Sequence, residues 1–280
     1  GAFGPADGIG ALDIAAGGVV THSGRLEAGL RLQVGGILTV ASGGAIDVVG
    51  KGLRGGNNGS VFGEAGEAYS ATGDSIVAGA PWRVYGAAGA SSGGLGSAGS
   101  EGGPTNAAYG LLESPAHLGA GGGRGGHNYA PGLGGNGGGR VTIDAGVLQV
   151  DGAIRADGAT VPIDDSFYYQ PGAGAGGSIL IRAGTLRGSG RISAAGGGNG
   201  RDVWNSYGGS GGGGRVAVYY DALSLPVDSI TARGGVAVNV PGVGGSAGTV
   251  YLKANAEPYG SVIVDNGNNA CGLFTPWRSA

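Results

Sequence analysis

Short segments in which apolar and polar residues alternate recur in the C-terminal half of the chain. The first apolar position of each segment is separated from the next by 38, 37 and 34 residues, and another apolar residue follows two positions later each time. Alternate residues of a strand face the same side of a sheet, so each segment is predicted to be a β-strand with one buried face. The first apolar positions are Val141, Ile179, Val216 and Val250.

A second, shorter strand is predicted after each of these segments, at 153–156, 191–194, 229–232 and 261–264. Within the first three, Ile154, Ile192 and Ile230 are separated by 38 and 38 residues, so two independent positions agree on one period. Such self-similarity is typical of repeat architectures. Related pieces without the same regularity occur nearer the N-terminus, at 11–14, 18–21, 37–40 and 45–48.

The recurring strands predict an all-β fold, a parallel β-helix (β-solenoid) in which equivalent strands of successive coils stack in register. We expect one elongated domain over residues 1–280. A glycine-rich insert at about 50–138 interrupts the pattern, and an apolar C-terminal tail covers 268–280.

Glycine accounts for 71 of the 280 residues, about a quarter of the chain, against roughly 7% in average proteins. No strict three-residue period is present, which excludes collagen. Hydrophobic residues make up 41% and charged residues only 12%, unlike a disordered chain. The glycine runs are either flexible loops or ordered, polyglycine II-like connecting segments. We favour the second because glycine runs lie next to every strand pair; any disorder is expected within 50–138.

The charge and motif content argue against most enzymatic and nucleic-acid functions. A net charge of −3 gives no electrostatic footprint for nucleic acid, and no apolar run is long enough for a membrane span. None of the three histidines has metal-ligand spacing, and the glycine runs precede no helix that could make a phosphate site. We therefore expect no enzyme, no catalytic residue, no cofactor and no metal. The segment Asp265–Asn269 could ligate calcium, although Asn-Gly turn chemistry explains it equally.

Aromatic residues gather in a few segments outside the predicted strands. Such residues could contact a partner, a neighbouring subunit or a sugar, or they could cover the glycine-rich segments as small satellite cores. Adjacent Asp164 and Asp165 would face opposite sides of a strand and so do not form an acid/base pair. The candidate contact residues are Phe167, Tyr168, Tyr169, Trp204, Tyr207, Cys271, Phe274 and Trp277.

The repeat units resemble the glycine-rich repeats of large bacterial surface and secreted proteins. The resemblance is carried by 185–196, 211–221 and 248–253 with 264–267, and it covers about residues 30–267. It implies an adhesin-like, right-handed parallel β-helix that is extracellular or on the cell surface, with a structural or adhesive role. It transfers no active site.

Two functions remain open at this point. A solenoid has unpaired strand edges at both ends, and head-to-tail stacking into a homo-polymer would pair them. The chain would then be a structural subunit of a fibre, a surface layer or an adhesin stalk. The alternative is a carbohydrate-binding or polysaccharide-degrading β-helix protein with a cell-surface polysaccharide as its partner. The repeats carry no stacked ladder of Asp residues, which disfavours the degrading enzyme.

Overall fold

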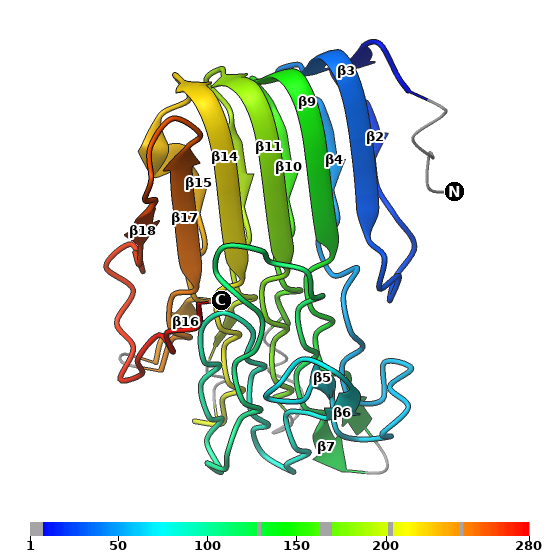
Figure 1. Cartoon of the computed structure of the whole chain (residues 1–280). Helices are drawn as coiled ribbons and strands as arrows, with labels where there is room; N and C mark the ends of the chain where they lie inside the picture. The colour runs from blue at the N-terminus through cyan, green and yellow to red at the C-terminus, as the bar shows by residue number, and fades with distance from the viewer. Residues whose placement is uncertain (1–7, 128–129, 163–169, 201–203, 241–242, 280) are drawn as a thin grey trace.

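The computed structural model describes residues 8–127, 130–162, 170–200, 204–240 and 243–279. Two sheets face each other in the upper half of the molecule, and below them the chain continues as a bundle of loop segments (Figure 1). These segments are rich in glycine. The main hydrophobic core lies between the two sheets.

The larger sheet has seven strands, which are parallel except for the last one. β18 runs antiparallel to β17, whereas every other neighbouring pair of this sheet is parallel. In spatial order the strands are β1 (Leu12–Ile14), β3 (Leu30–Val40), β9 (Arg140–Val150), β11 (Ser178–Arg187), β14 (Arg215–Leu223), β17 (Thr249–Ala254) and β18 (Ser261–Ile263).

The second sheet has five short strands, all parallel. In every repeat except the last, the strand of the larger sheet is followed by a strand of this sheet, so the two sheets share the same order of repeats. A short 3-10 helix, Val227–Ser229, precedes the strand of this sheet that comes last in the sequence, β15. In spatial order they are β15 (Ile230–Thr231), β12 (Arg191–Ser193), β10 (Ala153–Arg155), β4 (Ala45–Asp47) and β2 (Val19–Val20).

The repeat period sets the register of both sheets. Ile179 pairs with Val141 on one side and with Val216 on the other, and Val216 pairs with Val250. In the smaller sheet Ile192 lies between Ile154 and Ile230. The two predicted ladders are therefore confirmed. Their side chains are almost completely buried because each ladder faces the opposite sheet.

The prediction of a closed β-solenoid is wrong. The strands form a mixed seven-stranded sheet and a separate five-stranded parallel sheet, and within the described residues no coil closes around them. The physical reason is that the chain leaves the sheets after each short strand. There it forms hydrogen bonds with the equivalent segment of the next repeat and also with segments far away in the sequence. For example, Gly52 donates to Gly137 O (2.6 Å) and Gly94 donates to Gly213 O (2.7 Å).

The strand predicted at 261–264 is present, but it does not lie in the smaller sheet, where the repeat pattern placed it. It forms β18 at the edge of the larger sheet, antiparallel to β17, and does not extend the smaller sheet. The remaining strands form three two-stranded sheets: β5 (Glu67–Tyr69) with β6 (Ile76–Ala78), β7 (Gly125–His127) with β8 (Ala130–Gly132), and β13 (Asn199–Gly200) with β16 (Ala237–Val238).

Below the sheets, extended glycine-rich segments pack directly against one another; we call this region the glycine layer. Gly122 donates to Gly135 O, Gly135 donates to Gly172 O, and Gly172 donates to Gly123 O, each at 2.9 Å. Three separate stretches of the chain are joined in this way without any side chain between them. The layer comprises residues 52–56, 86–99, 119–126, 134–139, 172–177, 208–214 and 244–248.

Close approach of the main chains explains why glycine is required here. A Cβ atom on Gly137 would collide with the carbonyl group of Gly119, and one on Gly172 would collide with Ala88 O. The insert also has a small core of its own, which includes Leu53, Tyr109 and Leu118. The described part of 50–138 is thus built into the glycine layer and this second core.

Gly137→Ala should lower the free energy of unfolding by about 1–3 kcal/mol or more, because the added methyl group meets rigid backbone. Gly24→Ala is the matched control, since a Cβ there has no neighbour within 4 Å. Urea denaturation of both variants measures the difference. Equal stability of the two variants would contradict the close packing of the layer.

Candidate functional site

The buried histidines have structural roles. His22 accepts a hydrogen bond at Nε2 from the backbone N–H of Arg140 (3.3 Å) and donates from Nδ1 to Ser23 O (2.7 Å). These two partners require the neutral ring, because the carbonyl takes the one ring proton and Nε2 must stay unprotonated. Burial lowers the pKa of His22, and it likewise lowers the pKa of His117.

The segment considered for calcium uses its polar groups internally. Asp265 accepts hydrogen bonds from Arg233 Nη2 (2.9 Å) and from the backbone N–H of Gly267 (2.8 Å), and both interactions lower its pKa. The Asn266 side chain accepts from the backbone N–H of Gly234 (2.8 Å). Among the described residues no group of three or more His, Cys, Asp or Glu side chains could hold a metal ion. Asn266 Nδ2 also donates to Gly245 O (3.1 Å), so the segment acts as a turn that ties the C-terminal end of the chain to the glycine layer.

The predicted contact residues fall into three groups. Phe167, Tyr168 and Tyr169 lie outside the described residues, as do Asp164 and Asp165. Trp204 is exposed and Tyr207 is half-buried; both lie next to the glycine layer, where Ser100 donates its backbone N–H to Tyr207 O (2.9 Å). The third group is the C-terminal tail.

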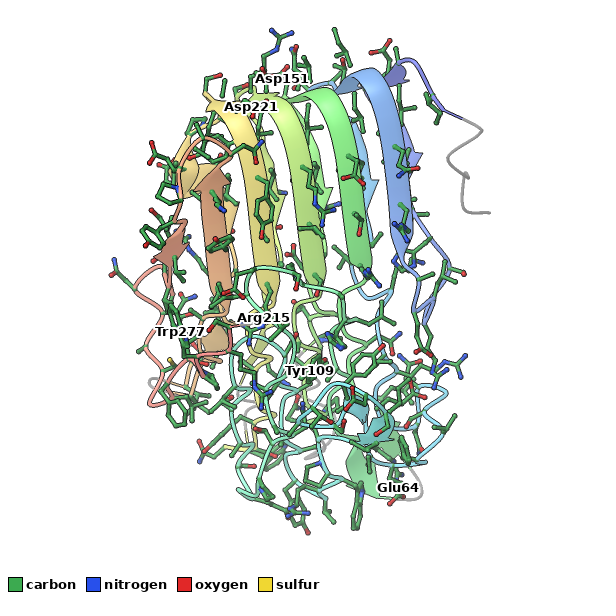
Figure 2. The ribbon with its side chains drawn as sticks, viewed as in Figure 1. Glu64, Tyr109, Asp151, Arg215, Asp221 and Trp277 are labelled. Carbon is green, nitrogen blue, oxygen red and sulfur yellow. The ribbon has the colours of Figure 1, made fainter. Side chains whose placement is uncertain are left out.

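The tail is fixed in place by its polar groups and presents its aromatic rings to solvent. Thr275 Oγ1 donates to Ala247 O (2.7 Å), and Arg278 O accepts from the backbone N–H of Leu112 (3.1 Å). Phe274 is 71% exposed and Trp277 64% exposed. Cys271 is a half-buried free thiol whose Sγ lies 3.4 Å from Asn266 Nδ2. Figure 2 shows Trp277 at the C-terminal side of the molecule, beside the last strands of the larger sheet.

The smaller sheet ends one strand earlier than the larger one at the C-terminal side. The strands β3, β9, β11 and β14 are each followed by a strand of the smaller sheet, but β17 is followed by β18, which returns to the larger sheet. An apolar cavity of about 360 Å³ lies at this place, beside β15 and within reach of β17 and β18. Its lining includes Val227, Ile230, Ala232, Val250 and Ile263.

Among residues 8–127, 130–162, 170–200, 204–240 and 243–279, the sheets end at the opposite side in β1 and β2, which each pair with a single neighbouring strand. Within the part of the chain that the structure describes, the outer edge of β2 is unpaired, and Val19 on it is 60% exposed. Leu26 and Ile37 are also exposed near this side. Both sides of the sheets therefore combine unpaired strand edges with exposed apolar side chains, and we call them the β2 end and the β15 end.

The residues of the C-terminal tail were identified in the sequence, but the cavity of the β15 end was not. The sequence carried no signal for the cavity, because the segment 261–264 fits the strand pattern and was predicted to continue the row of Ile154, Ile192 and Ile230. The β2 end was represented only by the weak strand pattern at 11–14 and 18–21.

Comparisons with known proteins identify no relative: no family model, no curated protein and no solved structure matches the chain. In the part of the chain that the structure describes, no helix has the length and apolar character needed to cross a membrane.

Lowering the pH from 7 toward 5 should destabilise the protein in part through His22 and His117. Folding lowers the pKa values of both histidines, so the unfolded state binds more protons than the folded state below about pH 6.5. The free energy of unfolding therefore decreases as the pH is lowered. The double variant His22→Gln, His117→Gln should show a smaller decrease than the unmodified chain. Urea denaturation at a series of pH values measures this, and identical pH profiles would contradict it.

Proposed function

We propose that the protein is an extracellular structural subunit that associates head to tail with further copies of itself, in a fibre, a surface layer or an adhesin stalk. The observation that carries this proposal is the difference between the two ends of the sheets. In the described residues, the β15 end has an apolar cavity where the smaller sheet stops one strand short of the larger one, and the β2 end has an unpaired strand edge with an exposed valine.

The register of the smaller sheet supports contact between unlike ends. Val20 pairs with Ile46, and the same row continues through the later repeats to Ile230 at the other edge. Val20 and Ile230 are therefore the two ends of one apolar row within a single copy. Placing the β2 end against the β15 end would extend that row and would bury apolar surface that a single copy exposes.

A contact between unlike ends does not close on itself and generates an open polymer. The exposed Phe274 and Trp277 lie on the tail that Thr275 anchors to Ala247 O, two residues before β17, and they add large apolar side chains of the type that dominates binding energy at interfaces. The extracellular location is supported by the resemblance of the repeats to those of bacterial surface proteins. The proposal assigns no chemical reaction to the protein.

Val19→Glu at the β2 end and Val264→Glu at the β15 end should each abolish polymer formation. Val264 is 52% exposed and lies between Ile263 and Asp265, which both line the cavity. A buried, unpaired carboxylate would make either contact unfavourable, whereas the monomer keeps its fold because both positions are exposed. Leu133→Glu, exposed in the region of β7 and β8, is the matched control and should polymerise normally. Sedimentation velocity and negative-stain microscopy report the assembly state.

Mixing the two blocked variants distinguishes the arrangement of the contact. Each variant keeps one intact end, so an equimolar mixture of Val19→Glu and Val264→Glu should form heterodimers and nothing larger. Dimers of Val19→Glu alone would indicate contact between two like ends and would contradict the head-to-tail arrangement. A monomeric unmodified chain at all concentrations would overturn the proposed function.

A further inference from the structure

A groove on the outer face of the larger sheet has the features of a ligand site. It has a volume of about 450 Å³ and crosses β9, β11, β14 and the end of β17. This volume lies within the range of about 300–1,000 Å³ that is typical of small-molecule sites. Side chains stand on this face of the strands in Figure 2, which labels Asp221 near its upper edge.

The floor of the groove is made by residues with little or no side chain. Ala145 pairs with Ala183, and the glycines that follow them, Gly146 and Gly184, lie side by side. A Cβ on Gly184 would lie 2.7 Å from Gly146 O, and one on Gly146 would lie 2.9 Å from the carbonyl oxygen of the corresponding glycine of β3. Close contact between neighbouring strands therefore keeps the floor free of side chains.

One wall is a row of polar and aromatic side chains, one from each strand. Asp144, Arg182, Tyr219 and Lys253 are partners in register on four successive strands. Arg182 Nη1 lies 3.4 Å from Asp144 Oδ1, and its guanidinium carbon lies 6.0 Å from the centre of the Tyr219 ring. The ring of Tyr251 meets that of Tyr219 edge to face, with 5.8 Å between their centres.

These side chains are held in position before any ligand arrives. The Tyr219 hydroxyl donates to Glu113 O (2.9 Å), which fixes the ring against the loop that covers the lower part of the sheet. On the opposite side of the groove, Asn255 Nδ2 donates to Asp221 Oδ1 (2.7 Å). Fixed side chains lose little conformational entropy on binding, which favours affinity.

The charges of the groove balance, and this selects the ligand class. The lining holds one carboxylate, Asp144, and one cation, Arg182. Next to it, Asp221 contacts Asn255 and Lys253 is the register partner of Tyr219, so the balance is kept and a charged ligand gains no net attraction. Hydrogen-bond donors and acceptors alternate along the wall, next to an aromatic ring with an apolar face. A neutral ligand rich in hydroxyl groups, with apolar C–H faces between them, matches this arrangement. Those are the properties of an uncharged sugar.

The row also repeats at the spacing of the strands, about 4.8 Å. An extended polymer that crosses the strands would meet one side chain of the row at each step, whereas a single sugar unit would use only a part of it. We propose that this groove binds a neutral polysaccharide chain that runs across the strands. The site is separate from the β2 and β15 ends, and it goes beyond the structural role proposed above.

Affinity electrophoresis tests the site with three neutral probes: galactomannan, xyloglucan and a mixed-linkage β-glucan. Polygalacturonate is the anionic comparison. We expect at least one neutral polysaccharide to retard the unmodified chain more than polygalacturonate does. Tyr219→Ala and Arg182→Ala should each weaken that affinity about tenfold, the loss expected for an aromatic contact or a hydrogen bond to a charged group.

Tyr85→Ala and Arg191→Ala are the matched controls, because both residues are exposed outside the groove and should leave binding unchanged. Tyr219→Phe keeps the ring and should bind, even if the alanine variant is unstable. Each measurement is repeated in the Val19→Glu background, so that binding is measured without association at the β2 end. Failure of all three neutral probes, stronger binding of polygalacturonate, or equal affinity of Arg182→Ala and Arg191→Ala would overturn the proposal.

Discussion

The structure depends on hydrogen bonds between main-chain segments that lie so close together that a Cβ atom on either one would collide with the other. In the glycine layer Gly177 donates to Ala156 O (2.7 Å) and Gly138 donates to Ala175 O (2.8 Å), with nothing but backbone between the segments. Ordering each residue costs about 1–2 kcal/mol of backbone entropy, and glycine loses the most. The layer offsets this cost because many segments are joined at once and because the two sheets hold their ends in register.

The periodic part of the fold was predictable, and the glycine-rich part was not. The ladders through Ile179 and Ile192 follow from apolar residues that recur at one spacing, since each position must meet its equivalent in the next repeat. Glycine carries no apolar pattern, so nothing in the sequence showed that the chain leaves the sheets and fails to close a solenoid. The direction of β18 was equally hidden, because three apolar or small residues fit a parallel or an antiparallel edge.

For the candidate sites too, only the features with a recognisable sequence signal could be predicted. Phe274 and Trp277 were recognisable because large aromatic residues are conspicuous in a chain of small ones. The groove was missed although its wall residues occupy one repeat position, because Asp144, Arg182 and Tyr219 share no chemical type. Their relation becomes visible only when the strands are placed in register. An irregular row on a regular scaffold can thus acquire binding properties without any change to the buried ladders.

The pairing of β3 with β9 has a consequence for the order of folding. Leu30 pairs with Val141, so the whole insert lies between two neighbouring strands. Pairing of residues far apart in sequence is slow, because the loop between them must close before the contact contributes any stability. By contrast, β9, β11 and β14 are joined by much shorter connections. The topology therefore favours nucleation in the C-terminal repeats, with β9 serving as the template onto which β3 and the N-terminal strands are added last.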